Sequence, residues 1–180
     1  MKATGIVRRI DDLGRIVIPK EIRRTLRIRE GDPLEIYTEK DGEVIFKKYS
    51  PMGDLQAVAA QLCESIGKNT GHIAAVADRD SIIAVAGAPK RELLEKRNSA
   101  ELEQLMERRE CYERGVDEQP EELISSQDGC AVVAEAPIIT DGDVSGCVAF
   151  VSEKEDEKAD EVLLKLCQSA AQFLSKRIAV

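Results

Sequence analysis

The stretch that decides the fold is residues 13–26, Leu-Gly-Arg-Ile-Val-Ile-Pro-Lys-Glu-Ile-Arg-Arg-Thr-Leu. Its first half predicts a short strand over 15–18, because β-branched residues favour extended backbone. Pro19 then suits the first position of a helix, where its missing N–H costs nothing. A helix over 20–26 is expected to follow, so the stretch indicates a small mixed unit at the start of the chain.

The predicted helix carries its positive charges on one face. Four cations follow the i, i+3, i+4, i+7 spacing, namely Lys20, Arg23, Arg24 and Arg27. Like charges this close repel one another unless something anionic lies opposite. Phosphates would relieve that repulsion and favour association by releasing counterions, and arginine can also reach guanine in the major groove. A solvated surface partly paired with Glu21, Glu30 or Asp32 explains the same periodicity, so the spacing alone leaves both interpretations open.

The rest of the first segment reads as strand, strand, short helix and hairpin. A strand over 4–10 and a turn over 11–14 precede the second strand, and the runs 34–38 and 44–48 flank Asp41-Gly42, a strong signal for a two-residue hairpin. Ile22 and Leu26 are expected to point toward a core. A segment of this size buries little apolar surface without a disulfide or a metal. Its many aliphatic residues therefore predict a core completed by a second chain.

The net charge of −8 hides an asymmetry between the two parts of the chain. Residues 1–50 hold 12 Lys/Arg against 9 Asp/Glu, a net of +3, whereas residues 51–180 carry a net of −11. This pattern favours a basic binding module on an acidic body. No apolar run reaches the ~18 residues of a membrane span, and the charged start of the chain predicts no secretory signal. The chain is therefore expected in the cytoplasm, with its thiols reduced.

Ser50-Pro51-Met52-Gly53 is the clearest boundary, since proline and glycine close together interrupt helices and strands. Beyond it, apolar stripes predict a helix over 54–66 and a final helix over 158–178. Between them we expect a charged helical stretch over 90–110 and a polar irregular piece over 112–128. Four strands are expected over 72–77, 81–86, 131–140 and 145–152. The order α-β-β-α-β-β-α is typical of an α+β layer arrangement.

The five cysteines include no C-x-x-C pair. Four of them fall in helix stripes or beside strands and are expected to pack in the core, namely Cys63, Cys130, Cys147 and Cys167. Cys111 lies in the polar stretch and is the expected exposed thiol, for which redox sensing is the alternative to an inert role.

The remaining polar motifs are interpreted as structural. His72 opens a strand and belongs to no metal-ligand spacing. The acidic run 153–157 is expected to precede and cap the last helix, where negative charge is favourable. Asp141-Gly142-Asp143 reads as a hairpin turn without the spacing of a calcium loop, and there is no phosphate loop and no dinucleotide fingerprint.

Residues 1–49 resemble the AbrB family of transition-state regulators at nearly every position. The motifs that carry the resemblance are Thr4-Gly5-Ile6-Val7-Arg8-Arg9-Ile10-Asp11, the stretch 13–26, Asp32-Pro33-Leu34-Glu35-Ile36 and Lys47-Lys48-Tyr49. The resemblance implies that two chains interleave their hairpins into one barrel-like dimer, whose arginines contact DNA by its shape more than by a strict consensus. The positions that match the family's DNA contacts are Arg8, Arg15, Arg23 and Arg24, and further candidates are Lys2, Arg9, Lys20 and Lys47.

At full length the chain resembles the sporulation-stage members of that family, in which the second part is similar to a GAF domain. The similarity is carried by residues 73–80, Val85-Ala86-Gly87, Ala136-Pro137-Ile138-Ile139 and Gly146-Cys147-Val148-Ala149-Phe150. A GAF fold often holds a small molecule between its sheet and helices. No ligand motif stands out, so we expect no cofactor, no metal and no catalytic residue, and leave an unidentified small ligand open.

The prediction as a whole is an α+β protein with a swapped-hairpin DNA-binding domain over 1–50, a linker over 51–55 and a GAF-like regulatory domain over 56–180. It is expected to bind double-stranded DNA as a dimer through residues 1–50. A tetramer would form through the second domain and its flanking helices, and no membrane would be involved. The expected role is a nucleoid-associated regulator of sporulation-stage genes, with activation and repression both open.

Two other functions remain as alternatives. Related swapped-hairpin proteins act as antitoxins that bind DNA and neutralise a toxin with a flexible acidic tail, but this chain ends in a patterned helix and carries a full second domain. Some GAF-fold proteins reduce small oxidised substrates with cysteines, but the cysteines here are spaced as packed residues.

Overall fold

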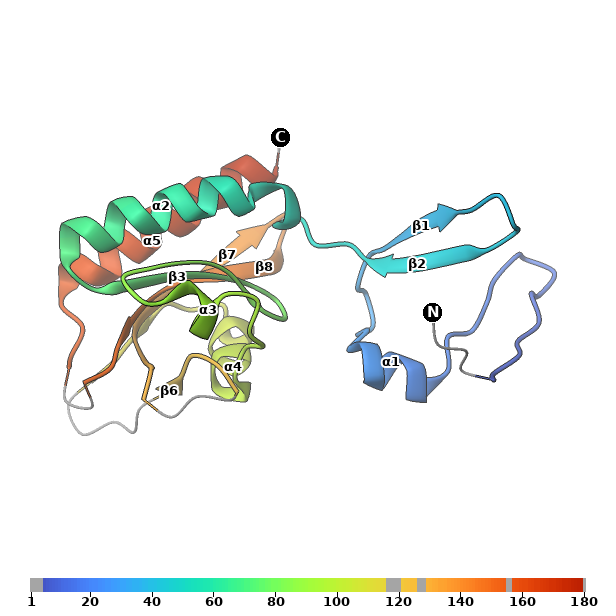
Figure 1. Cartoon of the computed structure of the whole chain (residues 1–180), viewed down its shortest axis with the longest axis horizontal. Coiled ribbons are helices and arrows are strands. Elements are labelled where there is room, and N and C mark those ends of the chain that lie inside the picture. The colour runs from blue at the N-terminus through green and yellow to red at the C-terminus, as the bar shows by residue number, and fades with distance from the viewer. Residues whose placement is uncertain (1–4, 116–120, 126–128, 155–156, 180) are drawn as a thin grey trace. The chain divides into compact units, whose positions relative to one another are not determined.

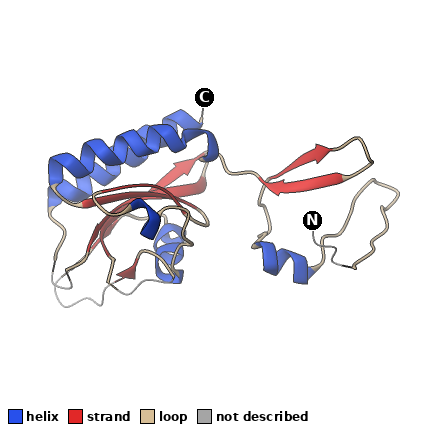
Figure 2. Cartoon of the chain, viewed as in Figure 1, coloured by secondary structure: helices blue, strands red, loops and turns tan. Residues whose placement is uncertain are grey.

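The computed structural model describes residues 5–115, 121–125, 129–154 and 157–179. These belong to two compact units, Met1–Tyr49 and Ser50–Val180 (Figure 1). Each unit has its own secondary structure, and the elements are coloured by type in Figure 2.

The described part of the first unit, residues 5–49, contains one helix and one hairpin, α1 (Lys20–Leu26), β1 (Leu34–Thr38) and β2 (Val44–Lys48). Pro19 lies just before the helix, and Arg27 ends it in the left-handed conformation with φ 51°. The hairpin is antiparallel, with Thr38 opposite Val44. Its turn differs from the expected two-residue type, because Gly42 donates its N–H to the carbonyl of Glu39 and adopts φ 82° after the turn, which is the place of a glycine bulge.

The strands predicted over 4–10 and 15–18 are absent from the described part of this segment, residues 5–19, which follows an irregular path around a turn. The turn is fixed by Asp11, whose carboxylate accepts hydrogen bonds from the N–H groups of Leu13 (3.0 Å) and Arg15 (2.7 Å). A strand needs a backbone partner, and none of the described segments pairs with this one. Most of its apolar side chains are exposed, Val7 at 84%, although Ile18 is half-buried and Pro19 is buried. The residues of this segment favour a strand, but the described residues of the single chain offer no neighbouring strand for it to pair with.

The second unit is a six-stranded antiparallel sheet with helices on both faces. The strand order is β4-β3-β8-β7-β5, with β6 also paired to β7. Its elements are η1 (Gly53–Leu55), α2 (Gln56–Thr70), β3 (Ile73–Asp78), β4 (Ile82–Ala86), α3 (Lys90–Leu93), α4 (Ala100–Arg108), β5 (Tyr112–Glu113), β6 (Glu121–Glu122), β7 (Ala131–Thr140), β8 (Asp143–Ser152) and α5 (Glu161–Ile178). This is the α+β layer arrangement that the sequence predicted.

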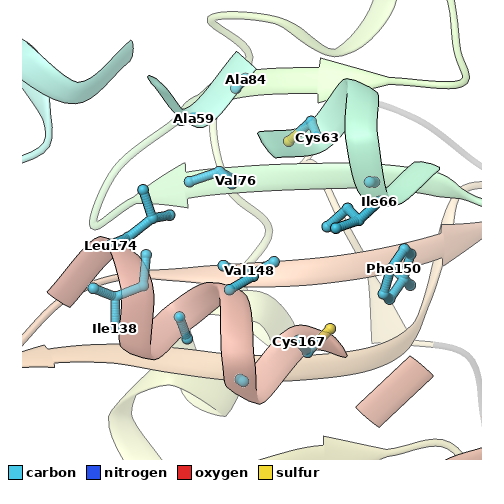
Figure 3. Packing of buried hydrophobic residues seen from close by; sticks show 14 of the residues in the cluster. Ala59, Cys63, Ile66, Val76, Ala84, Ile138, Val148, Phe150, Cys167 and Leu174 are labelled. Carbon is cyan, nitrogen blue, oxygen red and sulfur yellow. The ribbon is translucent and has the colours of Figure 1, made fainter. Parts of the chain in front are cut away.

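Two apolar clusters hold the layers together. On one face α2 and α5 lie side by side (Figure 1), and their stripes meet Val76, Val148 and Phe150 of the sheet (Figure 3). On the other face α4 packs Leu102 and its neighbours onto the strands. Both clusters exclude water almost completely, so this unit completes its core within a single chain.

The charged helical stretch predicted over 90–110 is broken into α3 and α4. The break at residues 94–99 inserts into the sheet edge, where Ile82 and Lys96 are joined through their backbones. Asn98 is buried and donates from Nδ2 to the carbonyl of Asp78 (2.9 Å), and Ser99 caps α4 by accepting from the N–H of Leu102 (2.9 Å). The neighbouring region, predicted as irregular, also contributes the short strands β5 and β6; residues 116–120 and 126–128 of it lie outside the described residues.

The acidic run 153–157 was expected to cap the last helix; its residues 155 and 156 lie outside the described residues, and the described members do not cap α5. Asp160 performs that role, accepting from the N–H of Leu163 at 2.8 Å. Glu157 is engaged elsewhere. It contacts His72 Nε2 (3.0 Å) and accepts a hydrogen bond from Ser152, whose hydroxyl is the main cause of its lowered pKa. His72 is thus held as a structural residue, with Nδ1 3.0 Å from the carbonyl of Thr70.

Candidate nucleic-acid interface

Helix α1 presents the densest group of open cations in the first unit. Lys20, Arg23 and Arg24 are exposed, and none of them forms an ion pair with any residue that the structure describes. Lys20 and Arg24 line an open hollow together with Glu21 and Thr25. Cations that are not neutralised by the protein's own carboxylates remain available to an external anion.

Arg27 does not share the exposure of the other three. It is half-buried at the end of α1, and its carbonyl accepts a hydrogen bond from Lys48 Nζ (3.1 Å). Asp32, one of the acids expected to neutralise the helix, accepts instead from the N–H of Arg29 (2.8 Å) and lies 3.5 Å from Lys48 Nζ. The predicted face of four cations is therefore a face of three, and the acids named as its internal partners are not paired with those three.

The loop before α1 holds the other candidate arginines, which differ in the contacts that they make. Arg8 and Arg9 are exposed, and Arg8 donates to the carbonyl of Val7 (3.1 Å). Arg15 is bound to its own turn, with Nε 2.8 Å from Asp11 Oδ2. The N–H and the guanidinium of Arg15 lower the pKa of Asp11, so that carboxylate stays ionised at neutral pH. Lys2 lies outside the described residues.

Lys47 is the candidate farthest from the helix in sequence. It lies on β2, exposed, with Nζ 4.5 Å from the centroid of the Tyr37 ring. This cation–π contact holds the ammonium on one face of the hairpin. A bound phosphate would have to share Lys47 with that ring.

The opposite face of the hairpin is apolar and open. It holds Leu34, Ile36, Val44 and Phe46, with Thr38 and Lys48 at its ends, because residues two apart on a strand point the same way. Ile36 and Phe46 lie directly opposite each other, yet they are 61% and 38% exposed. Leu26 of α1, expected to face a core, is also exposed, whereas Ile22 is half-buried.

The cysteines of the second unit follow the sequence prediction. Cys63, Cys130, Cys147 and Cys167 are buried and Cys111 is exposed. Burial raises the pKa of Cys63 to about 12, and it likewise raises that of the other three buried thiols. Protonated buried thiols are poor nucleophiles. The described residues include no group of His, Cys, Asp or Glu side chains placed to hold a metal ion, and no described helix is long and apolar enough to span a membrane.

Comparison with known proteins identifies the class of this chain as that of transcription regulators with an AbrB-type first unit. The family model described as stage V sporulation protein T C-terminal, transcription factor, matches residues 54–179. The chain belongs to the stage V sporulation protein T family.

The chain is similar to one known protein over its whole length and to others over its first unit alone. The chain is 46% identical over 179 residues to stage V sporulation protein T of Bacillus subtilis (strain 168), covering 99% of each protein. Over 51 residues it is 63% identical to the transition state regulatory protein AbrB of the same organism, covering 28% of this chain and 52% of that protein. A model described as antidote-toxin recognition MazE, bacterial antitoxin, matches residues 7–54.

The fold of the second unit also has solved counterparts. The GAF domain of a phosphoenolpyruvate-protein phosphotransferase from Coxiella burnetii aligns with a TM-score of 0.54 at 14% identity, covering 69% of this chain and 82% of that one. At this identity the likeness shows the fold alone. The predicted GAF-like architecture is confirmed, and with it the expected combination of an AbrB-type head and a GAF-like body.

Proposed function

We propose that this protein regulates transcription of sporulation-stage genes by binding double-stranded DNA with the exposed cations of its first unit. The observation that carries the proposal is the α1 face, where Lys20, Arg23 and Arg24 project without an internal ion pair among the described residues. Arg8, Arg9 and Lys47 extend the basic surface. Arg15 joins it when a phosphate replaces Asp11, and Lys2 is the remaining proposed contact.

The DNA-binding form would be a dimer through residues 1–50. The open apolar face of the hairpin supports this, since a single chain leaves Ile36 and Phe46 in water. Monomeric proteins rarely expose contiguous apolar surface of this kind. A second copy with the same face would cover it by an isologous contact.

A tetramer through the second unit is the next level of the proposal. Val162 and Phe173 of α5 are exposed apolar residues on the helical layer formed by α2 and α5. Pairing of these layers would join two dimers and give one assembly two DNA-binding heads, which raises avidity for paired sites. We place this assembly in the cytoplasm, on the nucleoid, with the second unit as a regulatory and not an enzymatic body.

The antitoxin function has one observation in its favour, the MazE model over residues 7–54. The first unit is also 63% identical to AbrB over 51 residues, and the full-length relative carries the sporulation name. Gene regulation therefore accounts for the whole chain, whereas the antitoxin model covers its first unit alone. Co-purification of a small toxin partner would favour the antitoxin function.

The test is a fluorescence anisotropy titration of duplex DNA at several salt concentrations. Arg23→Ala/Arg24→Ala is compared with wild type and with Arg91→Ala/Arg108→Ala, which removes the same charge from exposed positions of the second unit. The helix variant is expected to bind at least about tenfold more weakly, with a salt slope shallower by about 0.9 for each phosphate that it no longer neutralises. The control variant should match wild type.

The outcome also locates the interface. Equal weakening of both variants would show that only net charge matters, and undiminished binding by the helix variant would move the DNA-binding surface away from α1. Sedimentation of each variant as a folded wild-type assembly is the necessary control, because loss of the dimer would weaken DNA binding without touching the interface.

A further inference from the structure

One carboxyl group lies deep in the second unit. Glu135, in the middle of β7, is 0% exposed, and among the residues that the structure describes its carboxyl oxygens have no N–H or O–H donor; the weakly donating thiol of Cys147 is the neighbour that contacts it. Burying a polar group without a partner costs free energy, more so when the group is ionised. An unsatisfied group of this kind in a native protein calls for a physical explanation.

The strand register surrounds this carboxyl with short side chains. Glu135 lies opposite Tyr112 of β5 on one side and Ala149 of β8 on the other, and Ala149 in turn lies opposite Ala75 of β3. Residues directly opposite in an antiparallel pair point to the same face of the sheet. In the next row on that face, Cys147 and Ala77 are also small. The two central strands thus offer only alanine and cysteine beside the carboxyl.

This face of the sheet is the one covered by α4, opposite α2 and α5 (Figure 1). Helix α4 contributes Leu102, Leu105 and Met106 to the apolar cluster that also holds Ala75, Cys147 and Ala149. The Glu135 carboxyl, the short side chains beside it and the apolar residues of α4 therefore lie in one region between the sheet and α4.

The charged and titratable groups near Glu135 do not neutralise it. The elements packed around it bring Tyr112 of β5, Arg114 just after β5, Glu121 and Glu122 of β6, and Cys147 of β8. Burial raises the pKa of Glu135 to about 8, and the Cys147 thiol is the one neighbour that lowers it. The protein alone therefore keeps this group a neutral acid at neutral pH.

We propose that the region between the sheet and α4 binds a small organic cation, an ammonium group on a compact apolar body. The ammonium would donate hydrogen bonds to the Glu135 carboxylate, and the apolar body would lie over the short side chains of β3 and β8. An anionic ligand would gain no ion pair at this site, because ionised Glu135 would place a second negative charge beside it. The site rests on the geometry of the second unit, and only its link to gene control rests on the proposed function.

Binding at this site is coupled to a proton. The carboxyl proton leaves for the solvent when the ammonium arrives, because an adjacent cation favours the ionised form. Affinity should therefore rise with pH up to about 8, by as much as about tenfold for each pH unit.

Isothermal titration calorimetry of the full chain with isoamylamine tests the site, with 3-methyl-1-butanol and 3-methylbutanoate as neutral and anionic matches. Wild type is compared with Glu135→Gln and with Glu122→Gln, a control at an acid of the neighbouring strand β6. We expect saturable amine binding at millimolar concentration by wild type and by the control, at least tenfold weaker binding by Glu135→Gln, and no binding of the other two compounds. The pH dependence should vanish in Glu135→Gln.

Two results would overturn the proposal: no amine binding by wild type at millimolar concentration, or equal binding by Glu135→Gln. If that variant does not fold, Glu135→Leu replaces it, since apolar substitutes for buried charged groups are commonly tolerated. DNA titration of the same samples separates the two hypotheses. DNA binding without amine binding rejects this site alone, whereas amine binding without DNA binding rejects the regulator and keeps the site.

Discussion

The two units of this chain bury their apolar residues to opposite degrees. In the second, Phe150 and Leu174 are fully buried between the sheet and the paired helices. In the first, Pro19 is the one buried residue among those described, and side chains such as Ile36 and Phe46 stay open. Both units are rich in aliphatic residues, so hydrophobicity alone does not separate them. The difference teaches that one chain completes the core of the second unit but leaves apolar side chains of the first unit in water, where the proposed dimer would cover them.

The sharpest way to break this comparison is Ile36→Asp. A carboxylate in the middle of the apolar hairpin face would be buried on dimerisation, twice per dimer, at a cost of at least about 3 kcal/mol per chain. Hydrogen exchange read separately for each unit should show the β1–β2 amides unprotected and the second unit unchanged. Lys40→Asp, which adds the same group at the hairpin tip, should leave both units protected. Normal protection in Ile36→Asp would mean that the first unit needs no partner.

A pH titration of stability addresses the second unit alone. Glu135 has a folded-state pKa of about 8 against an ordinary value of 4.5. The folded chain therefore holds a proton that the unfolded chain has released across this window, and stability falls as pH rises through it, by on the order of 4 kcal/mol. Urea unfolding of wild type between pH 5 and pH 8 should show this loss, and Glu135→Gln should lack most of it. Parallel profiles for the two proteins would contradict the raised pKa.

Gly146→Ala tests how tightly the core of the second unit is built. A Cβ at Gly146 would lie 2.1 Å from the carbonyl oxygen of Ala77 on the paired strand β3, and backbone at that place cannot yield without disturbing the sheet. We expect a loss of about 3 kcal/mol in urea unfolding of the second unit. Gly53→Ala is the matched control, because no atom lies within 4 Å of its added Cβ. Equal stability of the two variants would show that the strands separate more easily than the structure implies.

The smallest expected effect concerns the start of α5. Asp160→Ala removes the cap on the N–H of Leu163 and should cost about 1 kcal/mol. Glu161→Ala, which removes a favourable first-turn charge but no cap, should cost only about 0.3 kcal/mol. Thermal unfolding of the two variants side by side measures the difference, and a smaller loss for Asp160→Ala than for Glu161→Ala would show that Asp160 does not stabilise α5 as its cap.

Much of the second unit could be predicted because each of its patterns finds a partner in the same chain. The final hairpin is an example, since Asp141 and Gly142 have φ of 52° and 87°, the conformation that a two-residue turn demands and that Asp-Gly favours. The break between α3 and α4 could not be placed in advance. The chain is fixed there by contacts such as the bridge between Ser81 and Arg97 and the hydrogen bond from Asn98 to Asp78, and these depend on the assembled sheet.

The sequence predicted which residues form the candidate interface better than it predicted the exposure and contacts of each one. The helical spacing correctly predicted that Lys20, Arg23 and Arg24 lie on α1 and are exposed. It could not show that Arg27 would be turned aside by the left-handed end of the helix, or that Arg15 would already hold a carboxylate. Glu135 was missed altogether. Its one sequence signal is an acid inside an otherwise apolar strand, which reads equally well as a solvent-facing position of an alternating pattern.

The chain that connects the two units is short, and its length limits how far apart the two ends that it joins can lie. Strand β2 ends at Lys48, and Met52 is already fully buried in the second unit. Four residue steps of about 3.5 Å give this tether a reach of roughly 14 Å. That radius is close to the width of one major groove, about 12 Å. In the proposed tetramer the end of each β2 strand would therefore stay within that reach of Met52, so the spacing of the second units would limit the spacing of the DNA sites that two DNA-binding units contact together.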